Sequence, residues 1–156
     1  MGAPLRVVID TNILVRGSIE RSIPHNNIMS LMLLRQHYLL LDFNGRLRKQ
    51  YHDNVGFDIY FQKWYKELQT KKRLQWFNGC PGAKLKEELR KRNLHDKVDQ
   101  IIVALSLNGD KYVITEDSDF GKGDSPKAAQ QRILLEYLVN DLNLTVHDAC
   151  EARAKL

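Results

Sequence analysis

Four aspartates stand where a parallel β-sheet would gather acidic side chains. Asp10 directly follows an apolar, β-branched run, and Asp117 and Asp119 follow a second such run that ends at Thr115. Asp99 lies near the start of an apolar helical segment that leads into this second run, so its helix begins at the edge where the strand ends. Because ligands bind at the carboxyl ends of parallel strands, we expect these carboxylates to converge.

Converging carboxylates repel one another, and a hard divalent cation relieves that repulsion. All-oxygen ligation favours Mg²⁺ or Mn²⁺, and such an ion can activate water and stabilise charge on a phosphodiester. The sequence offers no His-rich or Cys-rich cluster and no Ser-His-Asp pattern. These residues therefore predict metal-assisted phosphodiester hydrolysis.

Simpler roles for the same acids stay open. An aspartate after a strand commonly caps a helix, which would account for Asp10. Asp117 and Asp119 would then shape a turn, and Asp96 would be a helix cap or a solvated charge. Their coincidence at one predicted edge, together with Asp99, favours the metal site.

The elements that would position these acids alternate along the chain. Strands are predicted at residues 5–10, 38–42, 74–77, 111–115 and 142–146. Helices are predicted at residues 28–34, 46–55, 58–70, 83–92, 96–107 and 125–140, and from 147 onward. This alternation indicates an α/β fold with a parallel sheet between helical layers, and the apolar first and fourth strands are expected near its centre. The length fits one domain spanning residues 1–156.

Composition predicts a soluble cytoplasmic protein. Hydrophobic residues make up 43% of the chain, and no apolar run approaches the roughly 18 residues that cross a bilayer. No secretory signal is expected before the first strand. Cys80 and Cys150 are isolated thiols without metal-type spacing, which suits a reducing compartment.

Positive charge is concentrated in one part of the chain. The net charge is +5, and residues 62–97 alone carry +7, so the remainder is acidic. Clustered lysines and arginines suit a phosphate backbone, whereas a solvated helix face is the simpler explanation. Trp64 and Trp76 lie in the same stretch.

Three segments resemble the acidic motifs of the PIN-domain nucleases. VVIDTNIL at residues 7–14 is similar to their opening signature, DQIIVA at 99–104 to their third acidic motif, and VITEDSDF at 113–120 to their fourth. The step of sixteen residues from Asp99 to Thr115 also fits the family. Each motif is weak alone, but their order and spacing are specific and bracket most of the chain.

The resemblance implies a three-layer α/β/α sandwich around a central parallel sheet and an endoribonuclease that acts on single-stranded or structured RNA. Toxins of the VapC kind are familiar members of this size. By position, the resemblance assigns metal ligation to Asp10, Asp99, Asp117 and Asp119. It also implies that Asn12 helps to hold Asp10 and that Thr115 hydrogen-bonds a ligand or a bound water; Asp96 is the alternative third acid.

One position departs from the family pattern. The second acid of the family is commonly a Glu in the helix after the second strand, often followed by Tyr, but GRLRKQY at residues 45–51 places Gln50 there. A neutral amide is a poorer Mg²⁺ ligand than a carboxylate. Natural tolerance, a pseudo-enzyme and an inactivating substitution all remain open, as does a shifted alignment in which Asp42 or Asp53 serves.

In this fold the basic stretch is expected beside the acidic cleft, where it would hold the RNA backbone. Trp64, Tyr65 or Trp76 would stack on bases, although such aromatics more often belong to the core or to a dimer contact, which is favoured for Trp76. The candidate RNA-binding cations are Arg46, Arg48, Lys49, Lys71, Lys72 and Arg73.

Three functions are compatible with these residues. The first is a metal-dependent endoribonuclease, as a toxin with an antitoxin partner or as an RNA-processing or defence nuclease. The second is a non-catalytic PIN-like module that binds RNA or protein, which Gln50 keeps open. The third, a Mg²⁺-dependent phosphatase or receiver-type domain, is disfavoured because the first strand lacks an Asp-x-Asp pair. The helix at 28–34 belongs to the core or contributes to a homodimer.

Overall fold

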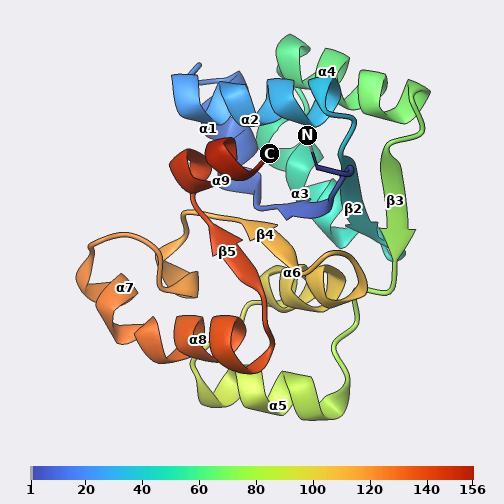
Figure 1. Cartoon of the computed structure of the whole chain (residues 1–156). Helices are drawn as coiled ribbons and strands as arrows, with labels where there is room; N and C mark the ends of the chain where they lie inside the picture. The colour runs from blue at the N-terminus through green and yellow to red at the C-terminus, as the bar shows by residue number, and fades with distance from the viewer. Residues whose placement is uncertain (1) are drawn as a thin grey trace.

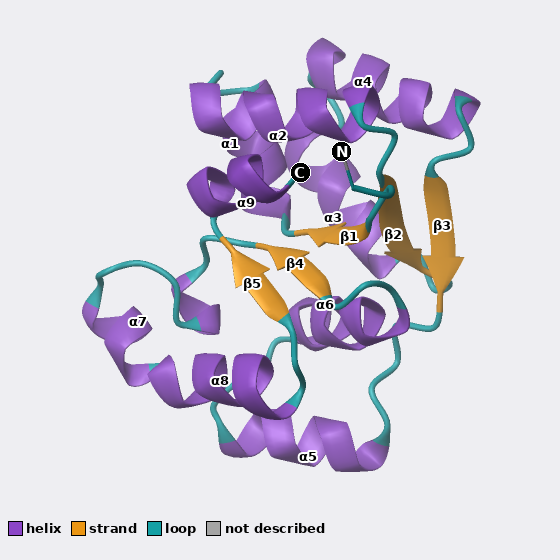
Figure 2. Cartoon of the chain, viewed as in Figure 1, coloured by secondary structure: helices purple, strands orange, loops and turns teal. Residues whose placement is uncertain are grey.

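A computed structural model describes residues 2–156, which contain one sheet of five parallel strands. The strands are β1 (Arg6–Ile9), β2 (Tyr38–Asp42), β3 (Leu74–Phe77), β4 (Tyr112–Ile114) and β5 (Thr145–His147). Their order in the sheet is β3-β2-β1-β4-β5, so β1 and β4 occupy central positions (Figure 2). In the register, Val7 pairs with Leu39 on one side and with Tyr112 on the other. The prediction that the first and fourth strands are central is confirmed.

Helices cover both faces of this sheet (Figure 1). One layer contains α1 (Thr11–Ser18), α2 (Ile23–Leu34), α3 (Arg46–Val55), α4 (Ile59–Thr70) and α9 (Ala149–Lys155). The other contains α5 (Ala83–Lys91), α6 (Lys97–Asn108), α7 (Pro126–Gln130) and α8 (Arg132–Glu136). The direction of strand order reverses after β3, and because parallel crossovers are right-handed, the helices that connect β3 to β4 and β4 to β5 pack on the opposite face. The predicted three-layer α/β/α, PIN-like fold class is confirmed.

The core lies on both sides of the central strands. Val7, Val8 and Ile9 are fully buried, as expected for a short apolar strand between two helical layers. None of the helices in residues 2–156 is long and apolar enough to cross a membrane.

Several predicted boundaries differ from the observed ones. Helix α1 was not predicted, and α2 begins at Ile23 rather than at residue 28. The helix predicted at 125–140 is interrupted at Gln131 and ends in a π-helical turn, Tyr137–Asp141. The last strand lies at Thr145–His147 rather than at 142–146. Of these differences, only α1 adjoins one of the predicted site acids, because it begins directly after Asp10.

The aromatic residues of the basic stretch lie in two environments. Trp64 and Tyr65 are buried, so stacking on RNA bases is wrong for them and the core alternative is confirmed. Trp76, expected in the core or at a dimer contact, lies outside the core on the edge strand β3 with 40% of its surface exposed. The Trp64 indole donates a hydrogen bond of 2.8 Å to the Met29 carbonyl oxygen, which ties α4 to α2.

Candidate metal centre

The first acid is fixed where β1 ends beside β4. The Asp10 backbone amide donates to the Ile114 carbonyl at 2.9 Å, and the Thr115 hydroxyl donates to Asp10 Oδ2 at 2.7 Å. Asp10 stands at the N-cap position of α1, but its carboxylate accepts no capping hydrogen bond from that helix. The Tyr51 hydroxyl of α3 donates to the Ile9 carbonyl and so fixes the backbone just before it. Asp10 therefore does not act as a side-chain cap of α1, which was the simpler explanation.

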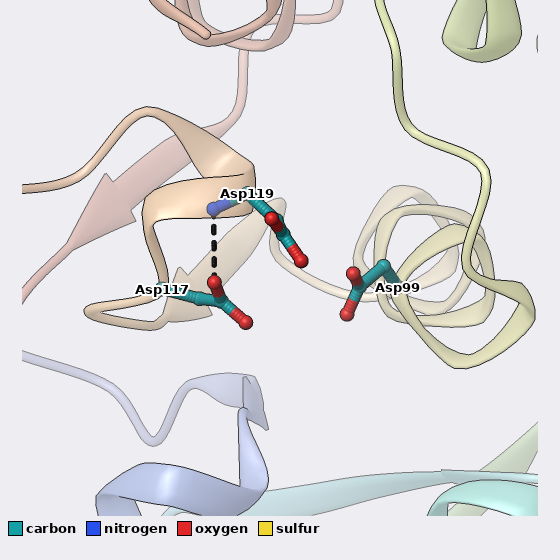
Figure 3. Close-up of side chains that lie close together, drawn as sticks. All are labelled: Asp99, Asp117 and Asp119. Atoms are coloured by element: carbon teal, nitrogen blue, oxygen red, sulfur yellow. Dashed lines mark hydrogen bonds between the residues drawn. The ribbon is translucent and has the colours of Figure 1, made fainter. Parts of the chain in front are cut away.

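The second pair of acids follows β4 in a short 3₁₀ turn, Ser118–Phe120. The Thr115 hydroxyl accepts from the Asp117 amide at 3.1 Å, and Asp117 Oδ1 accepts from the Asp119 amide at 2.8 Å. Both acids therefore shape the turn, as the simpler explanation predicted. The same bonds leave Asp117 Oδ2 and the Asp119 carboxylate directed toward α6 (Figure 3).

The third acid sits in the first turn of α6. Asp96 caps this helix, because its Oδ1 accepts from the amides of Val98 and Asp99 at 2.9 and 3.0 Å. Asp99 follows one turn later with only 8% of its surface exposed. Since α6 precedes β4 and runs antiparallel to it, the helix begins at the sheet edge that carries Asp10.

The three segments converge on one spot. One ligand oxygen each from Asp99, Asp117 and Asp119 lies within 4.8 Å of the others, and Figure 3 shows the three side chains directed into a common space. They border a cavity of about 160 Å³. Its lining, which we call the acidic cavity, consists of Asp10, Thr11, Asn12, Gln50, Asn54, Asp96, Asp99, Asp117 and Asp119.

Burial and mutual repulsion perturb two of these carboxyls. Burial, together with the charges of Asp117 and Asp119, raises the pKa of Asp10 to about 6, although the Thr115 hydrogen bond opposes the shift. Burial and the charges of its neighbours, Asp10 first among them, raise the pKa of Asp99 to about 8. A divalent cation would reverse both shifts, and the donor atoms are the hard oxygens that Mg²⁺ and Mn²⁺ prefer. The residues present therefore fit such an ion.

Lys127 of α7 supplies a positive charge at the rim of the cluster. Its ammonium pairs with the Asp119 carboxylate, and this hydrogen bond raises the pKa of Lys127. The lysine side chain is 60% exposed, so solvent screens the pair and it is easily exchanged. Asp119 thus has a counter-ion, whereas the more deeply buried Asp10 and Asp99 have none among the described residues.

Gln50 lies in the acidic cavity, as the alignment with the family pattern predicts. Its Oε1 accepts a hydrogen bond from the Thr11 hydroxyl, a partner that the sequence did not indicate. The proposed substitutes lie elsewhere. Asp42 accepts from the amides of Arg46 and Leu47 and caps α3, and the exposed Asp53 pairs with Lys49.

Two further residues of the acidic cavity differ from expectation. Asn12 lines the cavity and is exposed, but in residues 2–156 it makes no hydrogen bond to Asp10; the hydroxyl that holds Asp10 is that of Thr115. Asn54 was not singled out from the sequence, yet it lies one helical turn after Gln50 and donates to its carbonyl oxygen at 2.8 Å. Its spacing of four residues along α3 is the signal that identifies it.

A second polar cluster supports the turn that carries Asp117 and Asp119. Glu116 points away from the acidic cavity and pairs with the buried His25 of α2 and with Arg16 of α1. The Ser22 hydroxyl contacts the other ring nitrogen of His25 at 2.7 Å. This cluster ties the loop after β4 to the first two helices, and no sequence motif indicated it.

The candidate RNA-binding cations are divided between the carboxyl ends and the amino ends of the parallel strands. Arg46 and Lys49 line a hollow together with Gln50, next to the acids. Arg48 lies on the same helix, close to Tyr65 of α4. The segment 71–73 immediately precedes β3 and therefore lies at the opposite, amino-terminal edge. Lys71, Lys72 and Arg73 are thus not beside the acidic cavity, contrary to the expectation for the basic stretch.

Comparisons with known proteins bear on the fold. No protein-family model matches the chain, and no curated protein matches it. Among solved structures, it is similar to the crystal structure of VapBC2 from Rickettsia felis bound to a DNA fragment from their promoter. The similarity covers 92% of this chain and 98% of that chain, with a TM-score of 0.53 and 14% sequence identity. At this identity the likeness concerns the arrangement of helices and strands.

Proposed function

We propose that residues 1–156 form a single PIN-type nuclease domain that hydrolyses RNA phosphodiester bonds with Mg²⁺ or Mn²⁺. The observation that carries this proposal is the approach of the Asp99, Asp117 and Asp119 oxygens to within 4.8 Å of one another beside the buried Asp10. Three distant segments have no folding need to place four carboxylates together, and such a cluster costs stability unless a cation neutralises it. The similarity in fold to VapBC2 supports the same assignment.

Each residue has a definite part in this proposal. Asp10, Asp99, Asp117 and Asp119 would hold the ion, which supplies Lewis-acid activation of a water and of the scissile phosphodiester. Thr115 orients two of these ligands, because its hydroxyl donates to Asp10 and accepts from the Asp117 amide. The acids come from the strand ends and a helix start, so their positions are set by the sheet rather than by a mobile loop.

The substitution of Gln50 by Glu tests the proposal most directly. We expect the Gln50→Glu chain to cleave labelled RNA with Mn²⁺ roughly tenfold faster than the native chain or more, because a further carboxylate in the acidic cavity strengthens ion binding. A chelator should abolish cleavage. The matched control is Gln69→Glu, which adds the same charge on the exposed surface of α4 and should leave the rate unchanged. The absence of cleavage by all chains over varied RNAs would refute the proposal.

A non-catalytic PIN-like module is the second candidate. It is favoured by the hydrogen bond that Gln50 accepts from Thr11, because this bond gives the neutral amide a structural partner and leaves its oxygen less available to an ion. In that case calorimetry would detect Mn²⁺ binding, yet neither the native chain nor Gln50→Glu would cleave RNA.

A protein partner is a further part of the proposal. The VapBC2 structure suggests a toxin that works with an antitoxin, and α2 leaves Ile23 and Leu34 largely exposed at its two ends. Exposed apolar side chains of this size suit a protein interface. A homodimer through the same helix would use the same side chains, and light scattering of the isolated chain distinguishes the two arrangements.

A further inference from the structure

We propose that a hollow beyond the carboxyl ends of β2 and β3 binds the backbone of an RNA strand. We call this hollow the basic pocket; one further hollow lies between it and the acidic cavity. Its volume is about 270 Å³, and it is bordered by Arg46, Lys86, Lys97, Asn44 and Cys80 among others. The inference rests on the proposed function, because it assigns the path by which the substrate reaches the acids.

Three cations from three different elements meet at this pocket. Arg46 begins α3, Lys86 lies in the middle of α5, and Lys97 begins α6. Among residues 2–156, none of the three forms an ion pair with a carboxylate. Asp42 is the acid of the pocket, but it is buried and its two oxygens accept backbone amides of α3. The accessible charge of the pocket is therefore positive, as a phosphodiester requires.

A third hollow along α3 shares one lining residue with the basic pocket and another with the acidic cavity. Arg46 borders the basic pocket and this hollow, and Gln50 borders the hollow and the acidic cavity. On the facing helix α6, Lys97, Val98 and Asp99 line the three hollows in turn. The two helices thus form the walls of one groove that leads from the acids to the three cations.

The opposite flank of the acidic cavity offers no such path. There, Lys127 pairs with Asp119, and Lys122 pairs with Glu151 at 2.8 Å. Each of these two cations already faces a carboxylate, whereas the three cations of the basic pocket face none among the described residues. The charge pattern therefore directs the bound RNA toward β2 and β3 rather than toward β5.

The walls of the basic pocket suit a single nucleotide unit rather than a duplex. The volume lies near the lower end of small-ligand pockets, roughly 300–1,000 Å³. Pro81 and Ile101 give an apolar surface for a base or ribose, and the Asn44 amide contacts the Cys80 sulfur at 3.6 Å. Gly79 fixes one wall, since a Cβ there would approach that of Asp42 to 2.6 Å.

Binding of a fluorescent single-stranded RNA in EDTA tests the pocket without cleavage. We expect the triple variant Arg46→Ala, Lys86→Ala, Lys97→Ala to bind at least about tenfold more weakly than the native chain. The slope of log affinity against log salt should fall by about 2, because each neutralised phosphate of a single strand contributes roughly 0.7 to that slope. The control, Lys63→Ala, Lys66→Ala, Arg153→Ala, removes the same charges from exposed positions of α4 and α9 that do not border the basic pocket, and it should retain native affinity and slope. Equally weakened binding by both variants would overturn the pocket.

Protection of the cysteines from chemical labelling locates the bound RNA. This test does not depend on whether the triple variant folds. Cys80 borders the basic pocket, whereas Cys150 lies on α9 after β5, and both are exposed. We expect RNA to slow maleimide labelling of Cys80 in a Cys150→Ser chain severalfold and to leave Cys150 labelling unchanged in a Cys80→Ser chain. Protection of Cys150 alone, or of neither thiol, would overturn the assignment.

The outcome is separable from that of the proposed function. If RNA is cleaved while the triple variant binds normally and Cys80 is unprotected, the nuclease assignment stands and the basic pocket is wrong. If binding and Cys80 protection depend on the three cations but no chain cleaves RNA, the pocket stands and the nuclease assignment is wrong.

Discussion

Replacing Asp117 with Asn should lower the rate of RNA cleavage by about a hundredfold or more, measured in whichever of the native and Gln50→Glu chains is the faster. An asparagine oxygen can still accept the hydrogen bond from the Asp119 amide, so the turn after β4 is kept. What the substitution removes is one negative charge from the ion site, and ligands of this kind supply the electrostatic part of catalysis.

The matched control for that experiment is Asp96→Asn. Asp96 lines the same cavity, but its Oδ1 is engaged in capping α6, and asparagine caps a helix as well as aspartate does. We therefore expect its rate to change by no more than about threefold. A decrease as large as that of Asp117→Asn would make Asp96 the third ligand, whereas full activity of Asp117→Asn would remove Asp117 from the site.

Without metal, the Asp99→Asn chain should be more stable than the native chain. Burial and neighbouring carboxylates raise the pKa of Asp99 to about 8 from an ordinary value of 3.8. At neutral pH this acid therefore opposes folding, and one pKa unit corresponds to about 1.4 kcal/mol. We expect a gain on the order of 4 kcal/mol at pH 7, or a rise in Tm of roughly 8–16 °C.

The stability difference between the native and Asp99→Asn chains should grow as the pH rises. Because the folded-state pKa of Asp99 is raised, its favourable contribution is complete below pH 3.8 and is lost as the pH rises toward 8. The difference in Tm between the two chains should thus be small at pH 4 and grow up to about pH 8. Exposed Asp124→Asn is the control and should follow the native curve.

Added Mn²⁺ should reverse the order of stability. The ion stabilises a folded chain that binds it, by mass action, so the native Tm should rise with its concentration. The Asp99→Asn chain lacks a ligand and should respond weakly. Native stability that is insensitive to Mn²⁺ would contradict a metal site built on Asp99, even if the variant is more stable.

The sheet and the position of the acids could be predicted from the sequence. Each follows from a short apolar sequence pattern and from the rule that parallel strands end at the same edge of a sheet. The three buried residues of β1, Val7 to Ile9, have to be apolar because helices cover both faces of the strand, and the acid that follows them has to lie at the carboxyl edge. The start of α6 was likewise recognisable from Asp96, whose cap is a local interaction. Neither inference required knowledge of distant contacts.

Properties that depend on strand position in the sheet were harder to predict. Trp76 was assigned to the core or to a dimer contact, but β3 is an edge strand and keeps it out of the core. The position of residues 71–73 follows from sequence order alone, since a segment just before a parallel strand lies at the amino-terminal end of that strand. The pairing of His25 with Glu116 joins residues far apart in sequence and has no local signal.

Helix α1 was missed for a different reason. Its residues were interpreted as a motif rather than as a helix, and it contains Gly17, which lowers helical propensity. The glycine is needed for packing, because a Cβ at this position would lie 2.9 Å from the Met29 sulfur and 3.0 Å from the His25 carbonyl oxygen. Close contact between α1 and α2 therefore overrides local preference.

The central place of β1 has a consequence for how the protein is made. A chain that emerges from the ribosome can pair β1 with β2 early, but the other side of β1 stays open until β4 has been synthesised. Asp10 consequently meets Thr115, Asp117 and Asp119 only after most of the chain has been translated. A nascent chain thus carries its acids as separate, weakly interacting groups, and the proposed ion site is completed late in biosynthesis, once β4 has paired with β1.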